Sequence, residues 1–142
     1  MKILYLAAGH GQINSKHDVV YQDLIVKRDI GGDMLDVDLN GYDLIIATPP
    51  CNYYSRANWR YKTSDYSNKT KHLLPEIIKK LESLDVTVII ENVINKKRMS
   101  FILEKTTLFY TECGRHCYFT NRLVDFSTIP QSFDFEYEGK PV

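Results

Sequence analysis

The sequence predicts an α/β fold built on an open, mostly parallel sheet. Two apolar segments, residues 42–48 and 86–90, flank a stretch with helical periodicity, and a third apolar segment, residues 2–8, opens the chain. Continuous apolar runs are typical of strands buried on both faces, and strands that alternate with helices indicate a parallel sheet. The length of 142 residues, with 44% hydrophobic and 25% charged residues, fits one domain. We therefore expect residues 1–142 to form a single domain whose sheet is covered on both faces.

The first expected elements are two strands and a loop. Residues 2–8 form a strand that ends in the tight turn Gly9-His10-Gly11, and residues 19–26 form a second strand. Residues 29–38 are acidic and rich in glycine, which predicts mostly loop.

The central elements follow from periodicity and from proline. Residues 42–48 form a strand that stops at Pro49-Pro50, because proline cannot donate to a strand ladder. Residues 52–70 are polar and aromatic without a helical period, which predicts a long loop of the kind that often carries function. Residues 71–84 place their apolar side chains on one helical face, and residues 86–90 form another buried strand.

The last expected elements are a short helix over residues 100–105 and an antiparallel pair, residues 108–111 with 117–120, around Gly114. Lys+Arg and Asp+Glu both number 18, so a wholesale basic nucleic-acid binder is not expected. No apolar run approaches the roughly 18 residues of a membrane helix, so no membrane association is expected. Three cysteines without disulfide spacing indicate a reducing compartment, and we expect a cytoplasmic protein.

Two chemically useful side chains follow strands of the predicted sheet. Cys51 comes directly after Pro49-Pro50, and Glu91 comes directly after the buried run 86–90. A lone cysteine is often a small buried apolar residue, and a carboxylate at a strand end often caps a turn. Ligands of open α/β sheets, however, bind at the carboxyl ends of the strands where strand order reverses. If the two strands are neighbours, Cys51 and Glu91 face each other across one pocket.

These segments resemble the motifs of the DNA cytosine-5 methyltransferases. DLIIATPPCNYYS (43–55) is similar to their Pro-Cys-Gln motif, and VIIENV (88–93) is similar to their Glu-Asn-Val motif. ILYLAAGHGQ (3–12) resembles their Phe-Ala-Gly-x-Gly-Gly turn, and Gly32-Asp33-Met34 resembles the Gly-Asp-Ile segment that holds the adenine end of S-adenosylmethionine. The order and rough spacing of the motifs agree from residue 3 to about residue 93.

The resemblance implies a truncated, Rossmann-like methyltransferase domain that takes S-adenosylmethionine as cofactor and cytosine in DNA as substrate. Cys51 would attack carbon 6 of a cytosine flipped out of the stack, and Glu91 would supply a hydrogen bond or proton at nitrogen 3. Arg115 weakly echoes a later Gln-x-Arg-x-Arg motif and would bind the carbonyl oxygen of the base; the alternative is an exposed hairpin arginine. The implied cofactor-binding residues are Ala7, Ala8, Gly9, Gly11, Asp33 and Pro50.

The sequence also departs from the pattern of the family. The region between Gly9 and Asp33 is too short for the usual helix, which leaves Asp23 or Asp29 as candidate partners for the ribose hydroxyls. No target-recognition domain follows, so we expect recognition to be borne by a loop or supplied by a second subunit or a homodimer. A compact enzyme of this kind fits a phage or another mobile element, acting in a bacterial host cell.

The segment after Cys51 interleaves basic and aromatic residues without a hydrophobic stripe. Aromatic rings that stack on bases and cations that bind phosphate suit a loop that contacts nucleic acid. The candidate nucleic-acid-binding residues are Ser55, Arg56, Trp59, Arg60 and Lys62. The alternative is a solvated loop whose aromatic residues pack on the sheet edge.

Other interpretations stay open. Cys113, His116 and Cys117, completed by His72 or His10, suggest a metal site, but Cys-x-x-x-Cys without a second pair is poor spacing for zinc, and we expect no metal. The main alternative function is a degenerate family member that binds nucleic acid or a protein partner without catalysis. A further alternative keeps the chemistry and changes the substrate to RNA or a free nucleotide.

Overall fold

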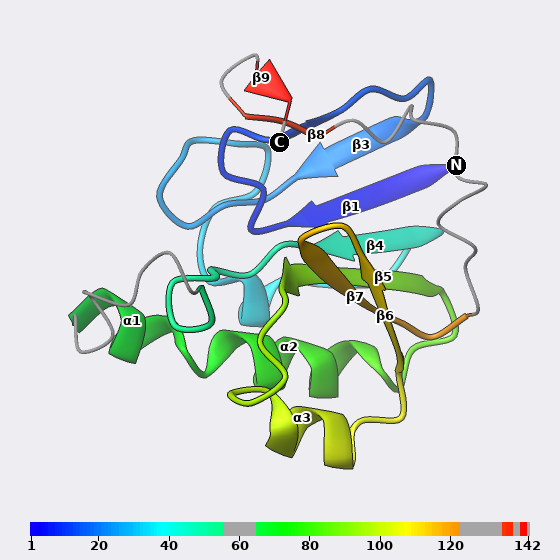
Figure 1. Ribbon diagram of the computed structural model, residues 1–142. Coiled ribbons are helices and arrows are strands. Elements are labelled where there is room, and N and C mark those ends of the chain that lie inside the picture. The colour runs from blue at the N-terminus through cyan, green and yellow to red at the C-terminus, as the bar shows by residue number, and fades with distance from the viewer. Residues whose placement is uncertain (56–64, 123–134, 138–139, 142) are drawn as a thin grey trace.

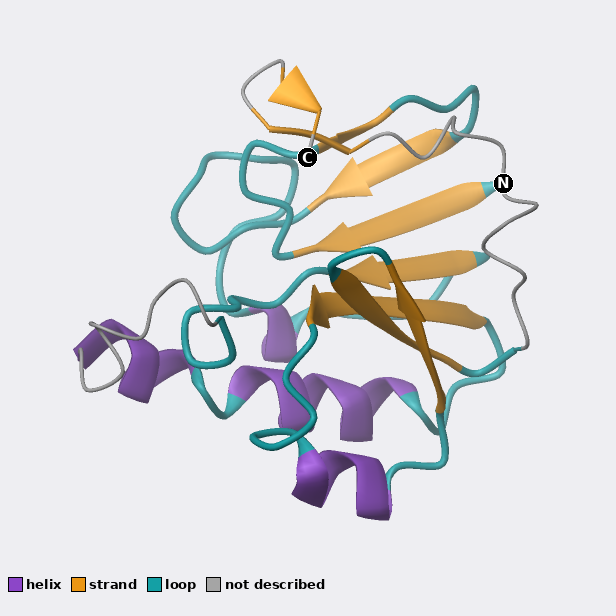
Figure 2. Cartoon of the chain, viewed as in Figure 1, coloured by secondary structure: helices purple, strands orange, loops and turns teal. Residues whose placement is uncertain are grey.

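The computed structural model describes residues 1–55, 65–122, 135–137 and 140–141. The strands are Lys2–Leu6 (β1), Gln12–Ile13 (β2), Asp18–Tyr21 (β3), Leu44–Ala47 (β4), Thr87–Val93 (β5), Phe109–Cys113 (β6), His116–Thr120 (β7), Phe135–Tyr137 (β8) and Lys140–Pro141 (β9). The helices are Asp65–Thr70 (α1), Leu73–Leu81 (α2) and Ser100–Lys105 (α3), with a 3-10 turn at Met34–Asp36 (η1). Figure 2 shows the helices gathered beneath a layer of strands.

Six strands form one sheet in the order β3-β1-β4-β5-β7-β6, and β2, β8 and β9 form a small second sheet. Strands β3, β1, β4 and β5 run parallel, whereas β7 is antiparallel to β5 and to β6. The predicted α/β class with a mostly parallel sheet is therefore confirmed. From β1 the chain passes to β3 on one side and later to β4 on the other, so strand order reverses between β1 and β4 (Figure 1).

The two faces of the large sheet are covered differently. Helix α2 buries its apolar stripe, Leu74, Ile77, Ile78 and Leu81, against one face, where η1 and α3 also pack (Figure 1). On the other face a smaller cluster forms around Ile3, Tyr5 and Ile46, and no described helix covers it. The expected cover on both faces comes from described helices on one face only, because the chain between β1 and β3 is too short for a crossover helix.

Several predicted boundaries differ from the structure. The second strand ends at Tyr21 instead of residue 26, because the Asp23 carboxylate accepts hydrogen bonds from the amides of Ile25 and Val26 and turns the chain. Strand β5 continues to Val93, since β7 pairs with its last residues.

The prediction of a loop over residues 52–70 is wrong for its last six residues, Asp65–Thr70, which form α1. The short helix over residues 100–105 and the hairpin around Gly114 are confirmed. Within the described part of the chain, no helix is long and apolar enough to cross a membrane.

Candidate functional site

A cavity of about 930 Å³ opens at the carboxyl ends of β1, β4 and β5. It lies where strand order reverses, which is the usual position for a ligand in an open α/β sheet. Its volume falls within the range of roughly 300–1,000 Å³ that small-molecule sites occupy. The residues predicted from sequence that line it are Ala7, Ala8, Gly9, Gly11, Asp33, Pro50, Cys51 and Glu91. The fold thus brings both predicted reactive groups and all predicted cofactor-binding residues to one place.

The glycine turn, residues 7–11, forms one wall of the cavity. Its sharp bend needs a positive φ at Ala7 (54°) and at Gly9 (55°), a conformation that glycine adopts freely and alanine does not. Gln22 holds this shape: its side-chain oxygen accepts the Ala7 N–H at 2.9 Å, and its amide nitrogen donates to the Gly32 carbonyl oxygen at 2.6 Å. Gln22 is 1% exposed, whereas Ala7 is half-buried and Gly32 is exposed, so the buried end of both bonds is the Gln22 side chain.

Asp23 and Arg28 hold the same turn from the loop after β3. The Asp23 carboxylate accepts the Gly9 N–H at 2.9 Å. The Arg28 guanidinium donates to the carbonyl oxygens of Gly9 at 2.8 Å and Gly11 at 3.1 Å, and it stacks over the Tyr21 ring. The side chains that make these bonds therefore come from a segment 14–19 residues downstream.

The amide groups of the glycine turn are directed into the protein. The residues whose N–H groups bond within the chain are Ala7, Ala8, Gly9 and Gly11. A glycine-rich turn that grips phosphate presents such N–H groups to its ligand. This turn lets a ligand approach the backbone closely but gives little support to a phosphate.

The proline turn, Pro49-Pro50, forms the facing wall and carries Cys51. The buried Asn92 side chain donates to the Pro49 carbonyl oxygen at 3.3 Å. The Cys51 carbonyl oxygen accepts the amides of Tyr54 at 2.9 Å and Ser55 at 2.8 Å, which closes the turn behind the thiol. Cys51 is thereby fixed at the cavity while its residue remains exposed.

The chain after Cys51 is anchored to the turn that follows β5. Asn95 donates to the Tyr54 carbonyl oxygen at 2.8 Å, and Arg98 donates to the Tyr53 carbonyl oxygen at 2.8 Å. The Arg98 guanidinium also lies 4.5 Å from the centroid of the Tyr53 ring. Tyr54 is 1% exposed and donates its hydroxyl to the Lys71 carbonyl oxygen at 3.1 Å, so its ring serves the core.

Glu91 lies within β5 and points to the face without described helices. Its neighbours Ile90 and Asn92 are buried toward the helices, and alternation along the strand sends the carboxylate the other way. Glu91 Oε1 contacts His116 Nδ1 on the adjacent strand β7. Among the described residues, His116 is the only hydrogen-bond partner of this carboxylate.

The electrostatics of the cavity disfavour an ionised thiol in the free protein. Although residue Cys51 is exposed as a whole, partial burial of its thiol raises the pKa of that group, and the negative charge of Glu91 raises this pKa further. Burial also raises the pKa of Tyr5 and of Tyr118, each to about 12, with Glu91 adding to both. Because the thiolate is the nucleophilic form, Cys51 needs an added positive charge or a base before it can react.

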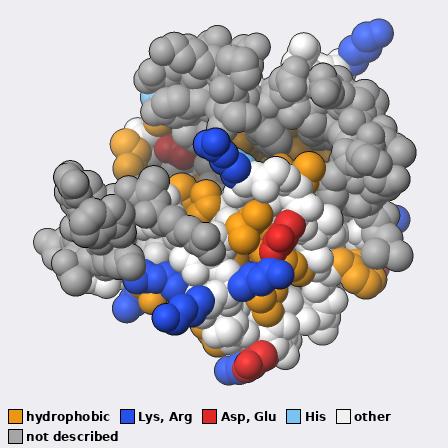
Figure 3. Space-filling view, viewed as in Figure 1, with side chains coloured by type: hydrophobic (Ala, Val, Ile, Leu, Met, Phe, Trp, Pro, Cys, Tyr) orange, Lys and Arg blue, Asp and Glu red, His pale blue; other side chains and the backbone are white. Residues whose placement is uncertain are grey.

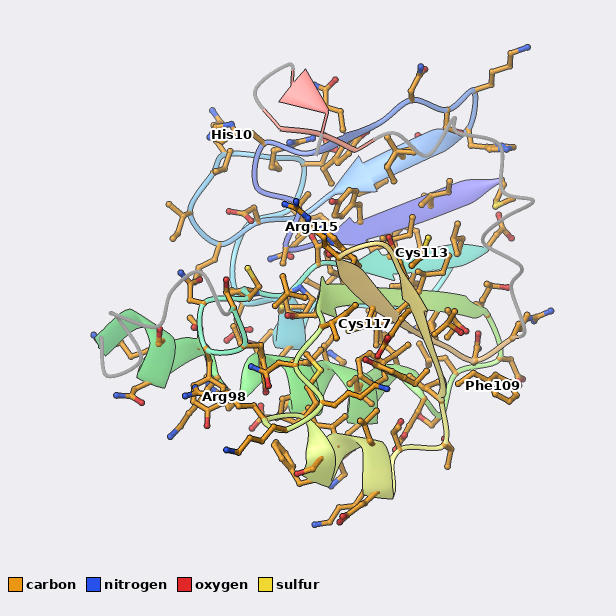
Figure 4. The ribbon with its side chains drawn as sticks, viewed as in Figure 1. His10, Arg98, Phe109, Cys113, Arg115 and Cys117 are labelled. Carbon is orange, nitrogen blue, oxygen red and sulfur yellow. The ribbon has the colours of Figure 1, made fainter. Side chains whose placement is uncertain are left out.

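The remaining predicted site residues lie apart from the cavity or outside the described residues. Arg115 is exposed in the turn between β6 and β7 and does not line the cavity (Figure 4). Ser55 is half-buried and likewise does not line it. Arg56, Trp59, Arg60 and Lys62 lie outside the described residues.

The two ribose candidates differ in position. Asp23 lines the cavity, whereas Asp29 does not and accepts the Tyr21 amide at 2.9 Å. Asp33 lies at the cavity margin, where its carboxylate accepts the Leu35 amide at 2.9 Å and caps η1.

The cysteine and histidine residues of the hairpin do not form a ligand set. Cys117 is buried among the helix-facing core residues, whereas His116, its neighbour along β7, lines the cavity on the opposite face. Cys113 is exposed on β6 (Figure 4). Over residues 1–55 and 65–122, no three His, Cys, Asp or Glu side chains gather closely enough to hold a metal ion.

The sequence did not indicate the contacts that Gln22 and Arg28 make with the glycine turn, or the contact of His116 with Glu91. For His116 a signal was present, because Cys117 and Phe119 are the apolar members of β7 and their burial sends His116 and Tyr118 to the other face. For Gln22 and Arg28 the function depends on tertiary hydrogen bonds that no local pattern indicates.

Comparison with known proteins supports the fold. No protein-family model matches the chain, and no curated protein matches its sequence. Among solved structures, the chain is similar to a methyltransferase of Entamoeba histolytica, with a TM-score of 0.54 and 16% identical residues. The similarity covers 91% of this chain and 55% of that structure, so the chain spans about half of its length. The chain thus has a methyltransferase-like α/β fold.

Proposed function

We propose that this protein transfers a methyl group from S-adenosylmethionine to carbon 5 of cytosine in DNA, through a covalent bond to Cys51. The observation that carries the proposal is that Cys51 and Glu91 line the same cavity as the glycine turn, at the reversal point of a methyltransferase-like sheet. The fold supports methyl transfer in general. The choice of cytosine rests on the resemblance of the segments around Cys51 and Glu91 to the cytosine-5 methyltransferase motifs.

The residues of the cavity fit S-adenosylmethionine. This cofactor has no phosphate, which agrees with a glycine turn whose amides already bond within the protein. It carries a positive sulfonium and an ammonium group, and the cavity offers the carboxylates of Asp23, Asp33 and Glu91. When bound, the cofactor supplies an electrophilic methyl group and a positive charge. Residues 7–11 and Pro50 would hold it, with Asp33 toward the adenine.

Cys51 and Glu91 would divide the chemistry between them. Cys51 would give its proton to solvent water, and its sulfur would add to carbon 6 of the base, so that the 5,6 double-bond electrons become available at carbon 5. Glu91 supplies a hydrogen bond or proton at nitrogen 3, which accepts the charge that this addition creates. Methyl transfer to carbon 5 would leave the cofactor as a neutral thioether. Solvent water would then take the proton from carbon 5, and the Cys51 sulfur would depart as a thiolate with the electrons of its bond to carbon 6, which restores the aromatic ring.

DNA is the proposed partner because positive side chains lie beside the cavity. Lys69 is exposed and lines the cavity, and Lys97 is exposed in the turn before α3. Lys and Arg side chains gather on this side of the molecule, between α1 and that turn (Figure 3). Cations in this position would bind the phosphates that flank an extruded base without reading sequence. Recognition of a target sequence would then come from a loop or from a second subunit.

A covalent trap tests the proposal. DNA that contains 5-fluorocytosine should form a stable adduct with the wild-type protein in the presence of S-adenosylmethionine, because fluorine at carbon 5 cannot leave as a proton does. Cys51→Ser should abolish both the adduct and methyl transfer. Cys113→Ser is the matched control, since Cys113 is exposed and does not line the cavity. Methylation that proceeds without any trapped adduct would exclude Cys51 as the nucleophile.

Two observations favour a second candidate, a module that binds nucleic acid or protein without catalysis. The pKa of the Cys51 thiol is raised in the free protein, and no helix lies between the glycine turn and β3. Calorimetry with S-adenosylmethionine distinguishes the two functions. Heat of binding that is lost in Gly9→Val supports the enzyme, and nucleic-acid binding without any cofactor heat supports the module.

A further inference from the structure

We propose that His116 is the positioning residue for Glu91: it holds one carboxylate oxygen on the sheet, so that the other oxygen is directed to the substrate. This inference rests on the proposed function, because the role of Glu91 in the reaction belongs to that proposal. The hydrogen bond between the two side chains is a property of the free protein and is tested separately.

The geometry places the two side chains on adjacent strands. Val93 of β5 pairs with His116 of β7, and Glu91 pairs with Tyr118, so His116 and Glu91 are diagonal neighbours on one face. Glu91 Oε1 contacts His116 Nδ1, and both residues line the cavity. Strand pairing therefore fixes the imidazole beside the carboxylate in the absence of any ligand.

The position of the proton in the hydrogen bond between His116 and Glu91 determines which tautomer of His116 the bond requires. An ionised carboxylate only accepts hydrogen bonds, so the bond requires the proton to lie on His116 Nδ1. Oε2 of Glu91 has no partner among the described residues. A proton that this oxygen takes up can therefore be given to nitrogen 3 of the substrate while Oε1 keeps its bond to Nδ1. The Glu91 side chain is 18% exposed, and that of His116 is 36% exposed. Glu91 is therefore the less solvated of the two, and loss of the His116 N–H would leave its charge with little compensation from water.

The neighbouring Arg115 does not supply this contact. It lies in the exposed turn before β7, and it does not line the cavity. One residue further along the chain, the pairing of β7 with β5 begins, and the first side chain that this pairing directs over Glu91 is that of His116. The carboxylate is therefore oriented by an imidazole and not by a guanidinium.

The first experiment reads the tautomer by NMR of protein labelled with ¹⁵N at histidine. The chain has 4 histidines, and the signals of His116 are those missing from His116→Asn. At a pH of about 8, where an ordinary imidazole is neutral, we expect the proton of His116 on Nδ1 in the wild type. In Glu91→Ala the proton should move toward Nε2. His72→Asn is the control, because His72 lines the same cavity without bonding to Glu91. A wild-type His116 with its proton on Nε2 would overturn the inference.

The second experiment separates positioning from general structural support. His116→Leu keeps the approximate volume but has no donor, whereas His116→Asn places an N–H at the same number of bonds from Cα as Nδ1. We expect His116→Leu to lower kcat by a factor on the order of 10–100, as for loss of a hydrogen bond to a charged group, with KM unchanged for both substrates. We expect His116→Asn to recover most of that loss.

The possible outcomes are distinct. An unchanged kcat in His116→Leu, or an Asn variant no more active than the Leu variant, overturns the positioning role. If the wild type transfers no methyl group, the proposed function fails, and the tautomer of His116 alone decides whether this residue orients Glu91.

Discussion

The two turns that form the walls of the cavity are stiffened by opposite means. The glycine turn consists of small residues, and its shape depends on side chains from the segment after β3, chiefly Gln22, Asp23 and Arg28. The proline turn is stiff by its own covalent structure, because two rings fix φ. Beneath it a single buried side chain, Asn92, bonds to the Pro49 carbonyl oxygen.

Because of this difference, substitutions that change the shape of the cavity should be distinct from substitutions that change the reactivity of the thiol. The wall that we propose receives the cofactor can be deformed by substitutions distant in sequence, since its backbone has little rigidity of its own. The wall that carries the thiol keeps its form locally, and its reactivity depends instead on the charge of Glu91. Four substitutions test the comparison.

The largest expected effect is on the reactive wall. Glu91→Gln should lower turnover by a factor on the order of 10²–10⁴, the range for loss of a positioned acid or base. It should also lower the pKa of Cys51, because the carboxylate charge that raises this pKa is removed. The measurement is the pH dependence of Cys51 alkylation by iodoacetamide in a Cys113→Ser background, where a lower pKa gives faster alkylation at a given pH. Glu112→Gln, on the exposed edge strand, is the control.

The next effect is on the glycine wall. Gln22→Ala should reduce the free energy of unfolding by about 2–4 kcal/mol, because it leaves the Ala7 N–H and the Gly32 carbonyl oxygen without their partner. Urea denaturation measures the change. Gln12→Ala removes an exposed glutamine and should stay within about 0.5 kcal/mol of the wild type. Equal effects of the two substitutions would mean that the turn keeps its shape without Gln22.

A smaller loss is expected when the proline wall loses its support. Asn92→Ala removes two side-chain hydrogen bonds, the one to the buried Pro49 carbonyl oxygen and the one from the Val93 N–H, at a cost of about 1–3 kcal/mol. Since the proline rings keep the turn stiff, the pKa of Cys51 should change little. Asn40→Ala, at an exposed position, is the control for denaturation. A large shift in the alkylation profile of Asn92→Ala would show that the proline turn also depends on distant support.

The smallest effect on stability compares two glycines. Gly9 (φ 55°) and Gly114 (φ 61°) both have a positive φ, and a Cβ built at either meets nothing within 4 Å. Valine at each position should therefore destabilise by about 1–2 kcal/mol through backbone strain alone. Only Gly9→Val should weaken binding of S-adenosylmethionine, because Gly9 lines the cavity and Gly114 does not. Equal calorimetric binding by both variants would remove the glycine turn from the cofactor site.

The elements that could be predicted are those whose signal is local. Apolar residues in the sequence predict β1, β4, β5 and the apolar stripe of α2, and the structure buries these residues. The approach of Cys51 and Glu91 was also predictable, because Cys51 follows β4 and Glu91 follows the part of β5 that pairs with β4, and parallel strands share a carboxyl edge.

The remainder depends on tertiary contacts. Helix α1 has six residues, too few to show a period, and β5 is extended by its pairing with β7. The same pairing decides between Arg115 and His116, since a shift of one residue along a strand turns a side chain to the other face. The resemblance assigns Arg115 to the carbonyl oxygen of the base and says nothing of His116, which strand register brings to Glu91.

The position of the reactive groups within the sheet sets how long they stay in place. Strands β4 and β5 are inner strands, whereas β3 and β6 are the edges. In native-state amide hydrogen exchange, edges open first and buried inner strands last. Release of β6 alone leaves β7 paired with β5, and so leaves His116 beside Glu91. The amides of β4 and β5 should be the last to exchange, which makes the cavity floor the longest-lived part of the native state.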